Sequence, residues 1–174
     1  MTIREASDSD QDAIEKIYRL AFPAEEADSV ASLATALLAT AAPTFALVTE
    51  MNGDVMAHVA FSPVVLEDGS DLAGFILAPL AVAPDFQKNG AGSKLVEAGL
   101  ERLSGDGADF VLVYGDPDYY GRFGFEADAA TAFQAPYPLA YPFGWQCRLL
   151  GDRVIGQHPS VITCVPALSR PELW

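Results

Sequence analysis

Basic residues are scarce in this sequence. Its 174 residues include 10 Lys and Arg against 24 Asp and Glu, and 24 − 10 gives a formal net charge of −14. A surface with this excess of negative charge repels the phosphate backbone of DNA or RNA. The composition therefore excludes general nucleic-acid binding.

Cysteine and histidine, the usual zinc ligands, are also scarce. The chain contains only Cys147 and Cys164, with no Cys-Xaa-Xaa-Cys pair, and its two histidines, His58 and His158, lie far apart in the sequence. We therefore expect no metal site. Two reduced thiols in half-buried strands are favoured over the one disulfide that two cysteines allow.

Long apolar runs are absent too. No stretch approaches the roughly 20 apolar residues needed to span a bilayer. The first five residues, Met-Thr-Ile-Arg-Glu, lack the basic-then-apolar layout of a signal peptide. We expect no membrane association and a cytoplasmic location.

The remaining composition is that of a folded domain. Hydrophobic residues make up 51% and charged residues 20%, which is too much apolar content for disorder. At roughly 150 residues per domain, and without repeats or linker-like tracts, the sequence predicts a single domain over residues 1–174.

Negative charge is concentrated in the first part of the chain. Residues 1–80 hold 13 acids and three bases, a net −10, whereas residues 81–174 hold 11 acids and seven bases, a net −4. Within the second part, residues 86–95 contain Lys88 and Lys94 and no acid. This locally basic stretch is a first indication of an anion site.

Two helices are predicted before the first strand. Ser7 or Asp8 can cap a helix whose apolar stripe is Ile14, Ile17, Tyr18 and Ala21, and Pro23 stops it. A second helix is predicted from about Glu25 to Ala41, with Val30, Leu33, Leu37 and Leu38 on one face.

A hairpin and a third strand are predicted next. Residues 45–50 and 55–61 flank Asn52-Gly53-Asp54, and Asn-Gly readily takes the positive φ angles of a type I′ turn. Residues 75–82 form the third strand. Its Pro79 cannot donate a ladder hydrogen bond, so we expect a bulge or a splayed edge there.

A strand–helix–strand unit follows. A helix beginning near Ser93 buries Leu95, Val96, Leu100 and Leu103, and residues 110–114 read as a buried parallel strand. Residues 117–123 are predicted to form a short helix or turn. Residues 145–150 and 160–165 are the clearest strands of the remainder.

The most informative segment is the Gly-rich turn Gln87-Lys-Asn-Gly90-Ala-Gly92-Ser93, between a strand and a helix. Glycines allow a tight turn in which backbone N–H groups and the helix dipole converge on one point, a geometry that binds phosphate oxygens. By itself a Gly-Xaa-Gly turn more often serves close packing at a helix start. Dinucleotide-binding and P-loop motifs do not fit, because Leu95 occupies the third glycine position of the first and Gly-Lys-Ser/Thr is absent. ATP or NAD binding is therefore disfavoured.

In this context the sequence resembles the GNAT superfamily of N-acetyltransferases, and most closely its YhbS-like bacterial branch. The stretch from Leu80 to Gly92 is similar to the family's Gln/Arg-Xaa-Xaa-Gly-Xaa-Gly/Ala motif after a strand, and Tyr120-Gly-Arg-Phe-Gly124-Phe125 is similar to a second motif. The likeness spans roughly residues 3–150 and includes the segments Ala60-Phe-Ser-Pro63 and Gly115-Asp-Pro117. It implies a mixed α/β (α+β) fold whose central, mostly antiparallel sheet is splayed at a parallel strand pair, with helices on both faces.

The resemblance also implies acetyl-CoA as co-substrate, with no metal. Backbone groups of Leu80, Ala81 and Val82 would pair with the pantetheine arm. The pyrophosphate would be held by the loop residues Gln87, Lys88, Asn89, Gly90, Ala91, Gly92 and Ser93. The reaction would be transfer of an acetyl group to a primary amine of a small molecule or peptide, by direct attack on the thioester.

Tyr120 is the residue that the resemblance assigns as general acid. A phenol with a reference pKa of about 10 stays protonated at neutral pH and can protonate the leaving thiolate. Tyr119 is the fallback, and packing of the ring against the sheet is the structural alternative.

The general base is left unassigned. Many GNAT enzymes carry a glutamate on the strand before the Gly-rich loop, whereas residues 75–83 contain no carboxylate. His58 and Asp116 have suitable chemistry, but each is more often a structural residue. The missing carboxylate keeps a non-catalytic acyl-CoA-binding or sensing domain as the alternative function.

Two segments of the sequence bear on the partners of the protein. The acidic first part of the chain suits a cationic amine acceptor, and a solvated acidic surface explains it equally well. The aromatic and Pro-rich residues 137–145 suit a pocket lining or a homodimer contact, although packing alone accounts for most of them.

Overall fold

The computed structural model describes residues 1–156 and 158–174. Its strands form a sheet in the order β1-β2-β3-β4-β5-β7, with β8 pairing β3 and β6 pairing β8 off this path. By packing, the chain divides into two compact units, Met1–Phe61 with Ala78–Gly99 and Ser62–Leu77 with Leu100–Trp174. Among the described residues, no helix has the length and apolar character to cross a membrane.

The first unit contains an antiparallel meander. β1 (Thr2–Glu5) pairs with β2 (Phe45–Met51), and β2 pairs with β3 (Asp54–Leu66) as far as Phe61. Asn52 and Gly53 have φ angles of 55° and 88°. The predicted hairpin with two left-handed turn residues is therefore confirmed.

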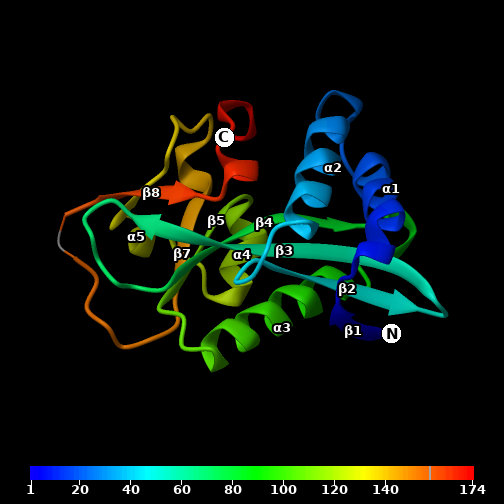
Figure 1. Cartoon of the computed structure of the whole chain (residues 1–174), viewed down its shortest axis with the longest axis horizontal. Helices are drawn as coiled ribbons and strands as arrows, with labels where there is room; N and C mark the ends of the chain where they lie inside the picture. The colour runs from blue at the N-terminus through cyan, green and yellow to red at the C-terminus, as the bar shows by residue number, and fades with distance from the viewer. Residues whose placement is uncertain (157) are drawn as a thin grey trace. The chain divides into compact units, whose positions relative to one another are not determined.

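Two helices pack against each other in the first unit (Figure 1). α1 (Gln11–Ala21) buries the predicted residues Ile14, Ile17 and Tyr18, and its core includes Val48 of β2. α2 (Ala24–Leu38) ends three residues before the predicted Ala41. Thr40 explains the earlier end, since its N–H donates to the Leu37 carbonyl and its hydroxyl to the Ala36 carbonyl, which caps the last turn.

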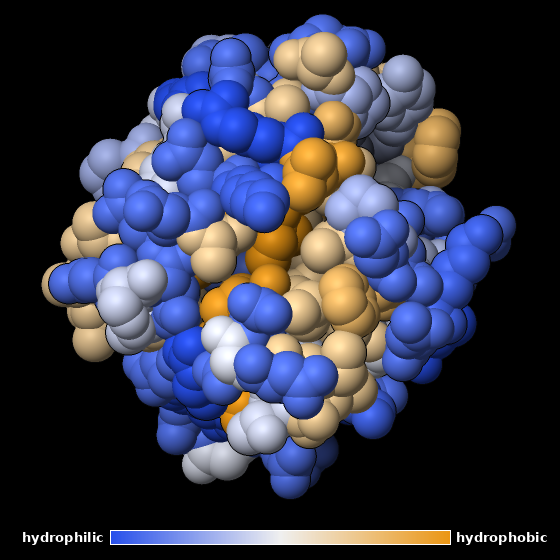
Figure 2. Space-filling view, turned by 90° about the vertical axis from the view of Figure 1, so that its right-hand side faces the viewer, coloured by the Kyte–Doolittle hydropathy of each residue, from blue (hydrophilic) through white to orange (hydrophobic). Residues whose placement is uncertain are grey.

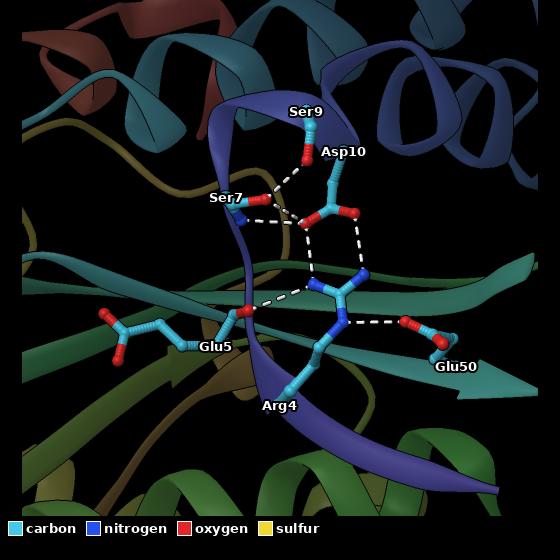
Figure 3. A network of polar contacts seen from close by, with 6 residues as sticks. All are labelled: Arg4, Glu5, Ser7, Ser9, Asp10 and Glu50. Carbon is cyan, nitrogen blue, oxygen red and sulfur yellow. Dashed lines mark hydrogen bonds and ion pairs between the residues drawn. The ribbon is translucent and has the colours of Figure 1, made fainter. Parts of the chain in front are cut away.

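An ion-pair network ties β1 to its neighbours (Figure 3). The two terminal nitrogens of Arg4 each donate to one oxygen of Asp10 at 2.8 Å, and its Nε donates to Glu50 Oε2 at 2.7 Å. The Ser7 N–H also donates to Asp10. Together, the Arg4 guanidinium and the Ser7 donors hold the pKa of Asp10 well below its usual range. The network therefore fixes the chain just before α1 on the edge of the sheet.

The second unit contains the parallel pair. Residues 74–77 of β4 (Gly74–Val82) run parallel to β5 (Phe110–Tyr114), and β5 is antiparallel to β7 (Trp145–Leu149). This ladder ends short of Pro79, whose peptide bond with Ala78 is cis. The predicted strand–helix–strand unit and the mostly antiparallel sheet with a parallel pair are confirmed.

The C-terminal strands complete this unit. The end of β3 pairs antiparallel with β8 (Ser160–Cys164), which also pairs parallel with the short β6 (Phe133–Gln134). Cys147 and Cys164 are free thiols, as predicted, and both are buried on strands that also carry exposed residues. Burial raises the pKa of each thiol to about 12, so both are inert at neutral pH.

α3 (Ala91–Gly105) connects β4 to β5 along the chain and begins two residues before the predicted Ser93. All four predicted apolar residues, Leu95, Val96, Leu100 and Leu103, are buried. The face drawn in Figure 2 is mostly hydrophilic, with hydrophobic residues exposed in a narrow band.

Candidate active site

The last residues of β4 form one part of the candidate site. Ala81 is buried in the core beside Tyr18, whereas Leu80 and Val82 are half-buried. The Ala83 N–H donates to the Met56 carbonyl of β3 at 2.8 Å, and the Gln87 side-chain amide donates to the Val82 carbonyl at 3.1 Å. The strand end is thus tied both to its neighbour and to the loop that follows.

The loop over residues 87–90 is exposed and contains two left-handed residues. Lys88 has a φ of 64° and Gly90 a φ of 82°. A Cβ added at Gly90 would meet no atom within 4 Å. Glycine is therefore favoured there by backbone conformation rather than by a steric neighbour.

The loop leads directly into the N-terminus of α3. The N–H groups of Ala91, Gly92 and Ser93 occupy the first helical turn, where no intrahelical acceptor exists. The positive end of the helix dipole lies at the same point, and Lys88 and Lys94 are exposed beside it. Such an arrangement can bind an anionic group mainly through backbone donors.

Tyr120 belongs to the second unit, at the end of α4 (Pro117–Tyr120). Its half-buried ring packs edge-on against Tyr119 and Phe125, at centroid distances of 5.0 Å and 5.8 Å. Burial, with a smaller effect of Tyr119 and Asp116, raises the pKa of Tyr120 above its usual range. This raised pKa keeps the phenol neutral at physiological pH, so its hydroxyl can act as a proton donor.

The fallback residue, Tyr119, has a different environment. The Arg122 guanidinium lies 4.6 Å from the centre of its ring, and Arg122 Nε donates to the Tyr119 carbonyl. A cation over an aromatic face is a stabilising contact. This arrangement favours a structural role for Tyr119.

His58 lies in the interior of the first unit. Its Nδ1 is hydrogen-bonded to the Tyr18 hydroxyl at 2.8 Å, and its side chain is fully buried. Burial lowers the pKa of His58 to about 3, so the ring is neutral and weakly basic. Nε2 is buried without a partner among the described residues. This environment favours a structural role over that of a general base.

Asp116 is the N-cap of α4. Its Oδ1 accepts from the Asp118 N–H at 2.9 Å, and its backbone carbonyl accepts from the N–H groups of Tyr119 and Tyr120. Capping of this kind explains a carboxylate at the position without a catalytic role. Neither candidate base is therefore favoured by its surroundings.

The comparison with family models settles the family. The acetyltransferase (GNAT) domain model matches residues 2–127. The chain belongs to the GNAT acetyltransferase family. The predicted resemblance is therefore confirmed.

Two curated GNAT relatives come from Escherichia coli K12. The protein named Uncharacterized N-acetyltransferase YjhQ is 37% identical over 134 residues, covering 75% of this chain and 73% of the relative. The one named Uncharacterized N-acetyltransferase YhbS is 37% identical over 139 residues, covering 79% and 81%.

Solved structures agree with the GNAT fold of this chain. YhbS from Escherichia coli, in complex with CoA, matches with a TM-score of 0.84 and 32% identity, covering 97% of this chain and 92% of that one. A GNAT family acetyltransferase from Brucella melitensis, in complex with acetyl-CoA, matches with a TM-score of 0.74 and 30% identity, covering 95% and 96%.

Sequence reasoning missed one residue of this GNAT chain that bears on the site. Gly115 lies against the Tyr120 ring, so that a Cβ there would fall 2.5 Å from Tyr120 Cε2. In the sequence, the segment Gly115-Asp-Pro117 indicated only the branch of the family, and nothing in it predicted the contact between Gly115 and Tyr120. Residues that could hold a metal do not gather in groups of three or more anywhere in the described part of the chain.

The aromatic segment 137–145 is partly exposed. Tyr141 and Phe143 expose 64% and 67% of their surface, whereas Trp145 is buried. Tyr137 and Trp145 both contact the ring of Trp174. Packing thus accounts for part of the segment, and the homodimer stays a prediction.

Proposed function

We propose that this GNAT acetyltransferase transfers an acetyl group from acetyl-CoA to a primary amine of a small molecule or peptide. The left-handed loop that enters the N-terminus of α3 carries this proposal. It is supported by the relatives of 32% and 30% identity solved with CoA and acetyl-CoA. The whole chain acts as one domain in this proposal, since β3, β4 and α3 each run through both units.

Cofactor binding uses backbone groups of the first unit. N–H groups of residues 87–93 hold the pyrophosphate of CoA, because a net charge of −14 leaves few side chains to do so. Leu80, Ala81 and Val82 pair with the pantetheine arm through their backbone. Lys88 and Lys94 add local positive charge.

The reaction needs two proton transfers and the stabilisation of one developing charge. The neutral amine attacks the thioester carbonyl, forming a C–N bond while charge develops on the oxygen, and a backbone N–H near Leu80 stabilises that charge. The C–S bond then breaks, and the electron pair leaves with the thiolate. Tyr120 donates its hydroxyl proton to that sulfur, the amine's excess proton passes to solvent, and the Tyr120 phenolate takes a proton back from solvent, which restores the phenol.

The acceptor is proposed to be an amine that is protonated, and therefore cationic, in bulk solution. The first 80 residues carry a net −10, and such a field raises the local concentration of cations. The amine loses a proton before it attacks. Because neither His58 nor Asp116 is favoured as base, we assign none.

Release of free CoA thiol from acetyl-CoA over a panel of amines tests the function. We expect at least one amine to accelerate thiol release, and Tyr120→Phe to slow it without weakening acetyl-CoA binding. The absence of a carboxylate on β4 is the observation that favours the alternative, a non-catalytic acyl-CoA sensor. Tight acetyl-CoA binding with no acceleration by any amine would support the sensor.

A further inference from the structure

The geometry points to Gly115 as a positioning residue that fixes the ring of Tyr120, and the inference rests on the proposed role of Tyr120 as general acid. Gly115 directly follows β5, and Tyr120 ends the helical turn that comes next. The two residues are in contact across that turn. A side chain at position 115 would occupy space that the ring now fills.

The contact is closer than any residue with a Cβ allows. A Cβ built on Gly115 would lie 2.5 Å from Tyr120 Cε2 and 3.0 Å from Cδ2. Carbon atoms in ordinary contact are about 3.5–4.0 Å apart. Either the ring or the backbone at 115 must therefore move by roughly 1 Å when a methyl group is added.

The backbone at Gly115 is held at both polar atoms. Its N–H donates to the Gly144 carbonyl at 2.9 Å, and its carbonyl accepts from the side-chain amide of Gln146 at 3.2 Å. Gln146 is itself 2% exposed and also donates to the Gly144 carbonyl. Breaking these partly buried bonds is costly, so the ring moves rather than the backbone.

The surroundings of Tyr120 restrict how its side chain can respond to a Cβ at position 115. Tyr119 and Phe125 lie edge-on to its ring, and its backbone N–H is bonded to the Asp116 carbonyl at 3.0 Å. The backbone of the residue is thus fixed, and its edge-on neighbours oppose a turn of the ring about the Cβ–Cγ bond. A push from position 115 therefore turns the side chain about its Cα–Cβ bond, which displaces the hydroxyl. A misplacement of about 1 Å in a reacting group can cost as much as 100-fold in rate.

Gly115→Ala tests the inference, with Gly121→Ala as its matched control. Gly121 directly follows Tyr120, has helical φ and ψ angles, and would place its Cβ within 4 Å of no atom. The first readout needs no acceptor: tyrosines are isotope-labelled at Cζ, and the Tyr120 resonance is assigned by its loss in Tyr120→Phe. We expect Gly115→Ala to shift this resonance, and Gly121→Ala to leave it in place.

The second readout is thiol release with the best amine of the panel. We expect Gly115→Ala to lower kcat by about 10- to 100-fold with little change in KM for acetyl-CoA. Added to Tyr120→Phe, it should cost no more than about twofold further, because both changes remove one interaction. An unmoved Tyr120 resonance, or full additivity, would overturn the inference.

The outcomes separate the inference from the function on which it rests. If Tyr120→Phe keeps the full rate while Gly115→Ala moves the resonance, the acid role fails and the positioning contact stands. If Tyr120→Phe slows the reaction while Gly115→Ala changes neither readout, the positioning role fails. Should Gly115→Ala not fold, Gln146→Met, which frees the Gly115 carbonyl without adding a Cβ there, is expected to move the same resonance.

Discussion

In the proposed function, residues 87–93 and residues 115–125 act through different kinds of atoms. In the first region the relevant groups are backbone N–H donors, arranged by left-handed Lys88 and Gly90 and by the start of α3. In the second region they are side chains, with the Tyr120 ring enclosed by Gly115, Tyr119 and Phe125. We therefore expect the first region to tolerate side-chain changes that keep its backbone conformation, whereas the second depends on its side chains.

The difference follows from the charge of the protein. With 24 acids against 10 bases, an anionic cofactor is best held by dipoles that do not titrate. A proton donor cannot be a backbone group, so it requires a side chain with a controlled environment. The predictions below test this division of roles.

Gly90→Val carries the largest expected effect. A β-branched residue is strained at a φ of 82°, and the loss of several backbone donors should weaken CoA binding by about 100-fold or more. Isothermal titration with CoA measures this. Gly107→Val is the matched control, because Gly107 has the same φ of 82° and open space around its Cβ. Equal affinity loss in both variants would contradict a binding role for the loop backbone.

Tyr120→Phe should act on rate and not on affinity. Loss of the hydroxyl removes the proton donor, so kcat should fall by about 10- to 100-fold while CoA affinity is kept. Thiol-release kinetics measure the fall in kcat, and a CoA titration of the same variant measures the affinity. Tyr119→Phe is the control and should stay within about twofold of the native rate, since its ring contact with Arg122 remains. A larger effect of Tyr119→Phe would exchange the two assignments.

The two regions were not equally readable from the sequence. The Gly-rich loop could be predicted because a backbone conformation leaves a local signal, here Gly90 and Gly92 between a strand and a helix. The same holds for the hairpin at Asn52-Gly53, whose left-handed turn is confirmed. Helix stripes such as Ile14, Ile17 and Tyr18 were predictable for a related reason, since burial on one face imposes a regular spacing.

Contacts between distant residues could not be predicted in this way. The pairing of His58 with Tyr18 joins residues 40 apart, and Gly115 is held by Gln146, 31 residues away. β1 was also missed, because four residues are too few to show alternation, and its place is fixed by the Arg4 network rather than by its own pattern. The backbone conformation of the candidate site was thus predictable from local sequence, and the packing of its side chains was not.

The two candidate bases extend the comparison, with one in each unit. His58 has a pKa lowered by burial to about 3, against 6.5 when unfolded. As the pH falls, His58 therefore takes up a proton in the unfolded state before it does so in the folded state. The free energy of unfolding decreases between pH 6.5 and 3, by about 1.4 kcal/mol per pH unit. Urea unfolding between pH 7 and about 4.5, above the range in which Asp10 titrates, should show this slope in the native protein.

His58→Gln provides the control for this slope. Glutamine keeps a polar partner for the Tyr18 hydroxyl and does not titrate. The variant should lose stability less steeply with falling pH. An unchanged slope would assign the acid sensitivity to another group, and loss of thiol release at neutral pH would return His58 to the list of bases.

Asp116→Ala should cost stability rather than chemistry. Removal of an N-cap carboxylate lowers the free energy of unfolding by about 1 kcal/mol. Asp116→Asn keeps the cap and removes the charge, so its stability and its rate at neutral pH should match the native protein. Urea unfolding and thiol release measure the two quantities. A stable Asp116→Asn protein with a greatly reduced rate would identify Asp116 as the base.

Lys88→Gly has the smallest expected effect and tests the backbone role most directly. Lysine at a φ of 64° pays for a left-handed conformation that glycine adopts freely. Glycine also makes the unfolded chain more flexible, which offsets part of this gain. The free energy of unfolding of the variant should therefore rise by about 0.5 kcal/mol. CoA affinity should fall by no more than about threefold, because Lys88 is one exposed charge. Lys88→Ala, which removes the charge but keeps the unfavourable φ, should show the same affinity without the gain in stability. If both variants lose as much CoA affinity as Gly90→Val, side-chain charge holds the phosphates, and the two regions bind and react through the same kind of group.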